Sequence, residues 1–312
     1  MTLRILSTSP LVGPALQDLG RRYPELAIAG FRSSAWNAGL AQAEALVVTL
    51  AEPLTAADLD RAPLLRAIGT YSVGVNHLPE ALCRERGIRI VNTPGVLTEA
   101  TADLALALLL ALSRRLEDGQ ALARSGAWEG WAPDQLLGTG LAGKTCGILG
   151  AGAIGKAFAR RVWALGMKPV FWCRQGPPTP VDFGPGTAER LPLDELLAQS
   201  SVLSLHCPLT AETRGLLTGT ALARLPRGAF LINTARGGIL DEPAAIRMLQ
   251  DDSLGGVGLD VYEGEPNINP EWATAPRAIL LPHLGSATVE TRQAMSRLLC
   301  DGIAETLAGK LS

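Results

Sequence analysis

The chain has 312 residues, a formal net charge of −2 and a sequence pI of about 6.0. A single hydrophobic core rarely grows beyond about 250 to 300 residues, so we expect two domains. The near-neutral charge, without a block of like sign, offers no basic field to a phosphate backbone and argues against nucleic acid as a partner.

The apolar segments argue against export and against a membrane partner. The first ten residues lack the cationic start and long apolar run of a signal peptide, so we expect a cytoplasmic protein. The most apolar run, Leu104–Leu112, is about half the length that spans a bilayer and is interpreted as part of a buried helix. The cysteines are scattered, without a C-x-x-C pair or a histidine at ligand spacing, so we expect neither a metal site nor a disulfide.

The first third of the chain alternates short β-type runs with helical stretches. Strands are predicted at residues 3–8, 45–49, 64–69 and 88–92. A helix start is predicted at Thr55, because Asp58 three residues later completes a capping-box pattern. The turn-forming residues 92–95 end this part, and an alanine- and leucine-rich helix is predicted over residues 98–124.

Beyond residue 140 the pattern restarts as a more regular β-α-β series. Strands are predicted at residues 145–149, 169–173, 201–206, 229–234, 256–260 and 278–281. Asp241 before Pro243 indicates a helix start, and residues 176–186 are predicted to be a loop rich in proline and glycine. A last helix, residues 287–307, is expected to pack back on the first domain.

This alternation predicts an α/β protein with two doubly wound, Rossmann-like domains built on parallel sheets. We place the first domain at residues 1–96 together with 286–312, and the second at residues 97–285.

A glycine loop stands between a predicted strand and a predicted helix of the second domain. Gly150 permits a tight turn, Gly152 lets a pyrophosphate approach the backbone, and Gly155 allows helix and strand to close. The N–H groups of Ala153 and Ile154, at the start of the helix, would then point toward the phosphates. The loop therefore predicts dinucleotide binding; the alternative is a glycine turn that binds nothing.

The end of the next strand bears on the choice of dinucleotide. An acidic residue there would accept hydrogen bonds from the adenosine ribose, but the chain has Cys173 and Arg174 at this place. An arginine suits a 2′-phosphate in charge and in bidentate geometry. We therefore predict a preference for NADPH, with NADH possible; the alternative is an ordinary surface arginine.

Three blocks beyond the glycine loop resemble the D-isomer-specific 2-hydroxyacid dehydrogenases in order and spacing. They are residues 233–238, 258–266 and 281–288. Residues 72–77 are similar to the family's substrate loop and residues 205–210 to its cofactor wall, so the resemblance covers essentially the whole chain. Within the family the chain looks most like glyoxylate and hydroxypyruvate reductases. Two departures are Ala153, where many members carry arginine, and the missing acid at Cys173 and Arg174.

The resemblance implies an N-terminal substrate domain completed by the last helix, an active site in the cleft between the domains, and a homodimer. The helix after Asn92 would then serve the dimer interface. Trp131 resembles a tryptophan that some reductases insert into a neighbouring subunit's pocket; interface packing is the alternative.

Three residues are predicted to carry the chemistry. Arg236 follows a strand, and its guanidinium group can donate hydrogen bonds to the substrate carboxylate and to the keto oxygen. His283 would donate the proton, but free imidazole has a pKa of about 6.5 and needs help to stay charged. By the resemblance, Glu265 is the carboxylate that favours the imidazolium. Val73 and Gly74 would offer backbone N–H groups to the substrate carboxylate.

The resemblance also predicts the remaining cofactor contacts. They are His206, Cys207, Pro208, Thr213, Thr234, Ala235, Asp260 and Gly285. Asp260 would receive the nicotinamide carboxamide, with a turn cap as the alternative, and Cys207 is expected to be an apolar wall rather than a nucleophile. His206 is otherwise interpreted as structural.

The predicted function is reduction of a small 2-keto acid, glyoxylate or hydroxypyruvate, to the D-2-hydroxy acid. One alternative is a reductase of longer, sugar-derived keto acids such as 2-ketogluconate, because pocket length depends on loops that sequence does not position. Another is a non-catalytic dinucleotide-sensing protein, against which the presence of Arg236, Glu265 and His283 argues.

Overall fold

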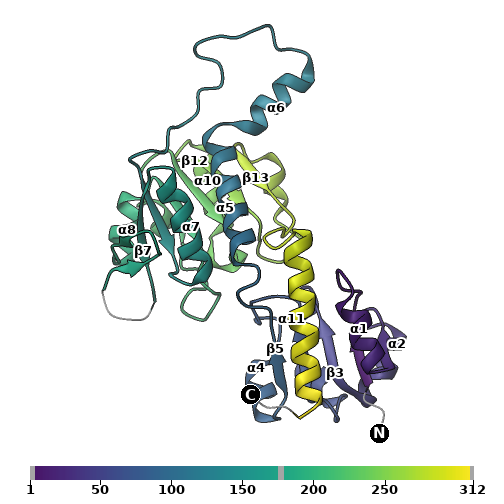
Figure 1. The fold of residues 1–312 in the computed structure, drawn as a ribbon. Coiled ribbons are helices and arrows are strands. Elements are labelled where there is room, and N and C mark those ends of the chain that lie inside the picture. Colours follow the sequence, from purple (N-terminus) through teal and green to yellow (C-terminus); the bar gives the residue numbers. More distant parts are fainter. Residues whose placement is uncertain (1–3, 175–178, 310–312) are drawn as a thin grey trace. The chain divides into compact units, whose positions relative to one another are not determined.

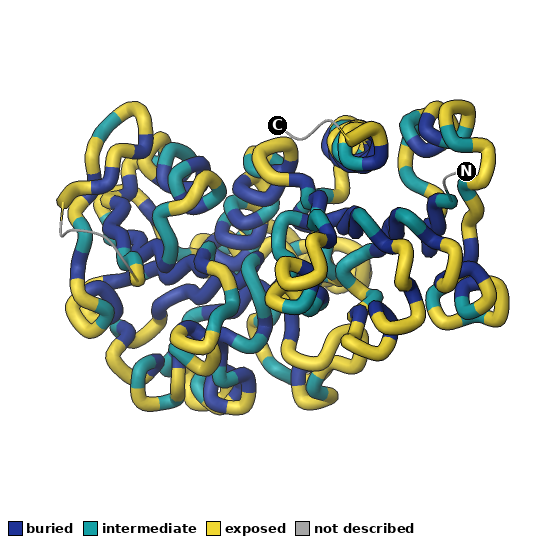
Figure 2. The backbone as a smooth tube through the Cα atoms, turned by 90° about the horizontal axis from the view of Figure 1, so that it is seen from below, coloured by how far each residue is buried: buried dark blue, intermediate teal, exposed yellow. Residues whose placement is uncertain are grey.

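The computed structural model of the chain describes residues 4–174 and 179–309. The chain divides into two units (Figure 1): unit 1 comprises residues 1–97 with 286–312, and unit 2 comprises residues 98–285. Each unit is built on a parallel β-sheet covered by helices, as the alternation of the sequence predicts. The buried strands run through the middle of each unit (Figure 2).

The sheet of unit 1 has the order β2–β1–β3–β4–β5, and all its described pairings are parallel. Its strands are β1 (Arg4–Ser7), β2 (Glu25–Ile28), β3 (Ala43–Val48), β4 (Ala67–Thr70) and β5 (Arg89–Val91). One face is covered by α1 (Ala15–Arg22) and α11 (Val289–Leu307). The other face is covered by α2 (Ser34–Gly39), the 3-10 turn η1 (Leu40–Gln42), α3 (Ala56–Asp60) and α4 (Glu80–Glu85).

Helix α11 comes from the end of the chain, yet it packs on the sheet of unit 1. Its buried face, which includes Leu299 and Ile303, lies on β3, β4 and β5. The hydroxyl of Tyr71, directly after β4, donates to the carbonyl of Arg292 and lies 3.1 Å from the Ser296 hydroxyl. These bonds tie α11 to the connection that carries Val73 and Gly74.

Local signals placed two helix starts correctly. The Thr55 hydroxyl accepts from the N–H of Asp58 and the Asp58 carboxylate accepts from the N–H of Thr55, which is the predicted capping box. Asp241 caps α10 (Glu242–Gln250) by accepting from the N–H of Ala244 at 3.0 Å.

The sheet of unit 2 has the order β13–β12–β11–β10–β6–β7, again parallel. Its strands are β6 (Thr145–Leu149), β7 (Lys168–Trp172), β10 (Val202–Leu205), β11 (Ala229–Asn233), β12 (Leu254–Leu259) and β13 (Ala278–Leu280). Helices α5 (Thr98–Ser113) and α7 (Ala153–Ala164) cover one face, and α8 (Leu193–Gln199), α9 (Gly219–Leu222) and α10 cover the other. The connections also contain the 3-10 turns η2 (Gly237–Ile239) and η3 (Pro270–Thr274).

The helix predicted over residues 98–124 is wrong in its continuity, because it is two helices. Helix α5 ends at Ser113, and α6 (Leu116–Ser125) begins after Arg115. Arg115 has a φ of 53°, a left-handed conformation that no right-handed helix can continue through. Because no glycine or proline marks this place, the sequence carries no local signal for the break.

Two further strand regions differ from the prediction. Strand β2 was not predicted, because it is an edge strand in which Glu25, Ala27 and Ile28 are exposed, so its residues show no buried periodicity. β8 (Val181–Asp182), inside the predicted loop 176–186, forms an antiparallel pair with β9 (Thr187–Ala188), which directly follows that loop. Residues 175–178 lie outside the described part of the chain.

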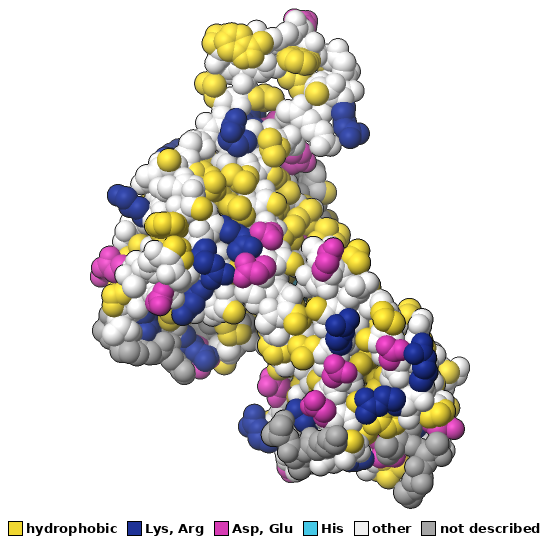
Figure 3. Space-filling model, viewed as in Figure 1, with side chains coloured by type: hydrophobic (Ala, Val, Ile, Leu, Met, Phe, Trp, Pro, Cys, Tyr) yellow, Lys and Arg dark blue, Asp and Glu magenta, His cyan; other side chains and the backbone are white. Residues whose placement is uncertain are grey.

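The segment from residue 116 to residue 140, which we call the α6 arm, extends away from the sheet of unit 2 (Figure 1). Helix α6 has no buried residue, and Trp131 is 82% exposed. Trp128 and Leu137 are also exposed, and hydrophobic side chains gather on this arm in Figure 3. No helix in the described ranges is long and apolar enough to cross a membrane.

Candidate active site

The predicted site residues of unit 2 follow the carboxyl ends of its strands. Parallel strands present these ends at one edge of the sheet, where ligands of open α/β sheets bind. The residues are the glycine loop after β6, Arg174 after β7, His206 after β10, Arg236 after β11, Asp260 after β12 and His283 just beyond β13. The strand order reverses at β6, so the glycine loop lies at the switch point.

The geometry of the glycine loop fits a pyrophosphate. A Cβ at Gly150, whose φ is 109°, would lie 2.8 Å from the backbone of His206 and Cys207. A Cβ at Gly155 would lie 2.0 Å from the Gly150 carbonyl oxygen, so only glycine lets α7 approach β6. Gly152, the N-cap of α7, has nothing within 4 Å of a Cβ position. Gly150 and Gly155 are therefore packed against protein backbone, whereas the space beside Gly152 is free. A phosphate in that space would be next to the N–H groups of Ala153 and Ile154.

Arg174 lies among polar groups of the connection after β10. Its Nη1 donates to the Glu212 carboxylate at 2.8 Å and to the Thr210 hydroxyl at 3.0 Å. The hydrogen bond from Thr210 and the charge of Arg174 hold the pKa of Glu212 below its usual value. Thr213 fastens this connection, because its hydroxyl donates to the Pro208 carbonyl and accepts from the Thr210 N–H, each at 2.7 Å.

The residues after β10 and β11 form a buried wall. Burial lowers the pKa of His206 to about 3, so the ring is neutral, with Nε2 2.8 Å from the Ser204 hydroxyl. Burial also raises the pKa of the Cys207 thiol to about 11, which suits an apolar wall and not a nucleophile. His206 Nδ1 and Thr234 Oγ1 are buried without a hydrogen-bond partner among the described residues. Such atoms fit a polar ligand that satisfies them.

Arg236 is positioned by a turn that Asn233 holds. The buried Asn233 side chain accepts from the N–H of Ala235 at 3.0 Å and donates to the Arg236 carbonyl at 2.9 Å. The guanidinium donates through Nη1 to the Ala235 carbonyl at 2.7 Å. Burial lowers the pKa of Arg236, while the Glu265 carboxylate acts to raise it. The group stays charged and presents a positive fork beside a carboxylate.

His283 and Glu265 form the pair expected from the sequence. His283 Nδ1 lies 2.8 Å from Glu265 Oε2, and Glu265 Oε1 accepts from the Tyr262 N–H at 2.7 Å. Burial alone would raise the pKa of Glu265, but these two bonds and the charges of His283 and Arg236 lower it below its usual value. Glu265 is therefore ionised at neutral pH and faces the imidazole as an anion.

Asp260 acts as a cap for the turn that bears His283. Its carboxylate oxygens accept from the N–H groups of Leu284 and Gly285, at 2.6 and 2.7 Å, and the residue is 1% exposed. Burial raises the pKa of Asp260, and the two N–H groups oppose that rise. The turn-cap alternative is thus present in the structure, and each oxygen retains a lone pair for a further donor.

Val73 and Gly74 belong to unit 1 and follow β4. The Asn92 side chain donates to the Val73 carbonyl at 2.8 Å, and the Ser72 hydroxyl donates to the Gly74 carbonyl at 2.7 Å. Both carbonyls are thereby held by side chains of the same unit. The peptide that bears the Val73 N–H is held through the Ser72 carbonyl, which accepts from the Thr93 N–H at 2.9 Å, and the peptide that bears the Gly74 N–H is held through the Val73 carbonyl.

Sequence reasoning missed the supporting residues of the site. Asn233 and Tyr262 lie in the blocks that carry the family resemblance, but nothing in the sequence assigned them contacts. The Tyr262 hydroxyl donates to the Leu281 carbonyl at 2.9 Å and so links the Glu265 loop to the residue that follows β13. The partner of Tyr262 is distant in sequence and gives no local signal, whereas the turn that Asn233 holds lies within three residues of it.

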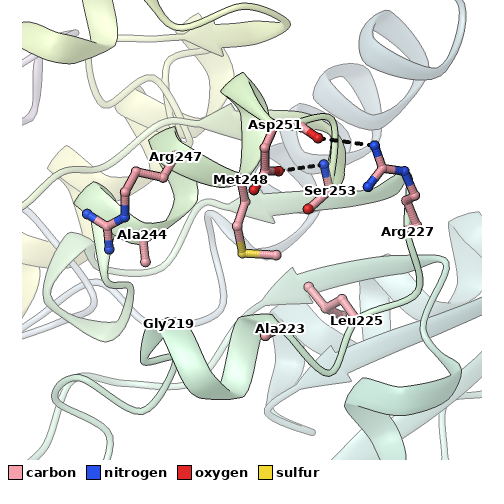
Figure 4. A pocket seen from close by; sticks show the side chains of 9 residues that line it. All are labelled: Gly219, Ala223, Leu225, Arg227, Ala244, Arg247, Met248, Asp251 and Ser253. Atoms are coloured by element: carbon pink, nitrogen blue, oxygen red, sulfur yellow. Dashed lines mark hydrogen bonds between the residues drawn. The ribbon is translucent and has the colours of Figure 1, made fainter.

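A cavity of about 540 Å³ lies elsewhere in unit 2, between α9 and α10 (Figure 4). Its lining includes Arg227 and Ser253, which precede β11 and β12 and so mark the amino ends of these strands. Arg227 donates to the Asp251 carbonyl at 3.1 Å across its rim. The cavity is therefore on the opposite edge of the sheet from the glycine loop and is not the candidate site.

Comparison with known proteins identifies the family. The sequence model described as D-isomer specific 2-hydroxyacid dehydrogenase, NAD binding domain, matches residues 106–285. The chain belongs to the D-isomer-specific 2-hydroxyacid dehydrogenases. The resemblance carried by the three blocks is thereby confirmed, and the matched range lies within unit 2 of this dehydrogenase.

Several relatives share most of the length of this dehydrogenase. Glyoxylate reductase of Thermococcus litoralis is 40% identical over 275 residues, covering 86% of this chain and 82% of the relative. Glycerate dehydrogenase of Hyphomicrobium methylovorum is 36% identical over 267 residues, covering 85% and 83%. The structure of an NADPH-dependent glyoxylate/hydroxypyruvate reductase of Sinorhizobium meliloti with NADP and malonate is 31% identical, with a TM-score of 0.88 over 99% of this chain and 94% of that chain. This dehydrogenase is accordingly an enzyme that acts on 2-keto acids with a nicotinamide dinucleotide.

Proposed function

We propose that this dehydrogenase reduces glyoxylate or hydroxypyruvate to the D-2-hydroxy acid, with NADPH as the preferred reductant. The observation that carries the proposal is the His283–Glu265 pair beside the Arg236 guanidinium at the carboxyl edge of the sheet. A proton donor and a carboxylate-binding cation at one edge suit the reduction of a compact 2-keto acid.

Each residue of this set has a separate role in the proposal. Bound nicotinamide supplies the hydride to the keto carbon. Arg236 orients the substrate carboxylate and polarises the keto oxygen, as a fixed cation does for a developing alkoxide. His283 is held through Nδ1 by Glu265, which leaves Nε2 to pass a proton to that oxygen. Val73 and Gly74 are assigned to the substrate carboxylate through their peptide N–H groups.

The cofactor residues are assigned by the same reasoning. The glycine loop, Arg174 and the wall after β10 hold the dinucleotide, and the unpartnered Thr234 Oγ1 and His206 Nδ1 support a polar ligand there. Asp260 and Gly285 are assigned to the carboxamide end. The Arg174 fork supports a 2′-phosphate, although it must release the Glu212 carboxylate to bind one.

A substrate panel tests the function. We expect glyoxylate or hydroxypyruvate to give the highest kcat/KM with NADPH, hydroxypyruvate to yield D-glycerate, and pyruvate to be poorer. If 2-ketogluconate exceeds both by an order of magnitude, the sugar-acid alternative replaces this proposal. If no keto acid is reduced while NADPH still binds, the chain is a dinucleotide-sensing protein instead.

The exposed α6 arm supports a homodimer, because Trp128, Trp131 and Leu137 would be shielded from water by a second copy of the chain. Dimer formation is part of this proposal and is tested by the size of the protein in solution.

A further inference from the structure

Glu242 is a buried carboxylate outside the set of residues described so far. It is the first residue of α10 and is 4% exposed. Its Oε1 accepts from the N–H of Glu263 at 2.7 Å, and its Oε2 accepts from Nε1 of the buried Trp272, also at 2.7 Å. Both donors belong to the connection between β12 and β13, the loop that carries Glu265.

The helix start alone does not account for Glu242. Asp241 already caps α10 through the Ala244 N–H, and an acidic side chain in a first turn gains from the helix dipole while still in water. Burying a carboxylate costs free energy unless hydrogen bonds replace its hydration. Here both oxygens receive donors that lie 21 and 30 residues farther along the chain, so the carboxylate joins two connections at the active edge.

A short path leads from Glu242 to the catalytic pair. The Glu263 N–H, which donates to Glu242, belongs to the peptide that joins Tyr262 to Glu263. The N–H of Tyr262 in turn donates to Glu265. The same peptide lies against Gly237, where a Cβ would come within 1.8 Å of the Tyr262 carbonyl carbon. Gly237 follows Arg236 directly, so this contact and the Glu242 bond lock the Arg236 turn to the Glu265 loop.

We propose that Glu242 is a positioning residue, which holds the loop at residues 262–265 so that Glu265 meets His283 beside Arg236. The inference rests on the proposed roles of these three residues. It requires the Glu263 contact in particular, because the Trp272 contact reaches a part of the loop beyond Glu265.

Two variants separate positioning from general stability. Glu242→Leu removes both acceptors, whereas Trp272→Phe removes one donor and leaves the Glu263 bond in place. We expect both to lower the unfolding temperature. Only Glu242→Leu should lower kcat for keto-acid reduction, by about tenfold or more, and move the reductive limb of the pH profile to lower pH. Dissociation constants for NADPH should stay within about twofold in both, because the glycine loop is untouched.

Glu242→Leu removes a carboxylate as well as two hydrogen-bond acceptors, so the pH profile needs a variant that separates charge from hydrogen bonding. The charges that face the His283–Glu265 pair are Asp260 from the end of β12 and Arg236 from the end of β11. Neither is changed, and Glu242→Gln removes the Glu242 carboxylate while keeping an acceptor, so a limb displaced in Glu242→Leu but not in Glu242→Gln reports how well Glu265 faces the imidazole. Glu242→Gln retains one acceptor for the Glu263 N–H and should restore much of the wild-type profile.

Combination with Glu265→Gln completes the test. If Glu242 acts through Glu265, the double variant Glu242→Leu/Glu265→Gln shifts the limb no farther than Glu265→Gln alone. An unchanged profile in folded Glu242→Leu, or an equal shift in Trp272→Phe, overturns the inference. If Glu242→Leu does not fold, Glu242→Asp is compared with Trp272→Phe, because its shorter side chain keeps the carboxylate but draws it away from the Glu263 N–H and should displace the limb. A limb that does not move in Glu265→Gln itself would instead remove Glu265 from its proposed role, whereas the substrate panel alone decides the proposed function.

Discussion

At the residue scale, the site depends on buried or half-buried charges whose partners are close in space and distant in sequence. Glu265 stays an anion because His283, the Tyr262 N–H and Arg236 outweigh the effect of burial on its pKa. His206 shows the opposite case, because it has no charged partner and burial alone keeps it neutral. The Glu265–His283 pair and His206 lead to three predictions.

Glu265→Gln should shift the pH dependence of the reaction. Reduction needs the protonated imidazole, so its rate is full at low pH and falls as pH rises through the apparent pKa of the coupled pair. The glutamine keeps the shape but removes the anion that favours the imidazolium, so the reductive limb should move to lower pH. Profiles of kcat/KM in both directions measure this, and a limb that stays in place removes Glu265 from this role.

His283→Ala provides the companion variant. It should lower kcat by about 10²- to 10⁴-fold, because the proton donor is lost. Dinucleotide binding, measured by fluorescence, should change little. Near-normal turnover would exclude His283 as the donor.

Burial of neutral His206 predicts a loss of stability in acid. The folded-state pKa is about 3, whereas an unfolded histidine titrates at about 6.5, so the unfolded chain binds the extra proton between these values. This contribution is complete above pH 6.5 and is lost on acidification, at about 1.4 kcal/mol per pH unit. Urea unfolding between pH 6.5 and 4.5 should give a slope shallower by about one proton in His206→Gln. Parallel slopes for the two proteins would contradict the prediction.

At the element scale, the connection between β6 and α7 assigns different tasks to its glycines. The Gly150 carbonyl oxygen occupies the space of a side chain at Gly155, because it would lie 2.0 Å from a Cβ there. A Cβ at Gly152 would instead point into open space. The first glycine serves packing of strand and helix, and the second leaves room for a ligand.

Alanine at these two glycines should therefore separate folding from binding. Gly155→Ala should destabilise unit 2 by at least about 1 to 3 kcal/mol, because the clash is with backbone. Gly152→Ala should leave the free energy of unfolding within about 0.5 kcal/mol, since the position is exposed with an ordinary φ. It should weaken NADPH binding at least about tenfold, or about 1.4 kcal/mol. Calorimetric titration and urea unfolding measure both; equal affinity in Gly152→Ala would argue against pyrophosphate at this loop.

The connection after β7 offers a similar test of cofactor choice. Arg174→Ala should reduce a preference for NADPH by about tenfold, since one charge-assisted contact to a 2′-phosphate is worth about 1.5 to 3 kcal/mol. The variant Glu195→Gln, an exposed change of charge on α8, is the control for general electrostatics. Equal or better use of NADH by the wild type would remove the NADPH preference from the proposal.

At the scale of the whole molecule, the α6 arm predicts association. The double variant Trp131→Ser/Leu137→Ser should shift sedimentation from dimer toward monomer. The substitutions remove exposed apolar surface whose burial between two copies would stabilise the dimer. Leu64→Ser, at an exposed leucine of unit 1, is the matched control and should not shift it. A wild type that sediments as a monomer would remove the dimer from the proposal.

Much of this protein could be predicted from local sequence. The parallel α/β class, most strands of both sheets, the capping box at Thr55 and the glycine loop all follow from short-range periodicity and turn chemistry. The three family blocks identified the chain before its fold was known, because they bring charged residues to strand ends in a specific order.

Tertiary structure decided what local signals cannot carry. The break at Arg115 has no glycine or proline, and the edge strand β2 has no buried periodicity, so both depend on what packs around them. The contacts of Tyr262 and Glu242 join residues of separate connections, and only the shared carboxyl edge of a parallel sheet brings those connections together. The sequence by itself determined which side chains hold the charges, and the packing of the strands decided which of those charges meet.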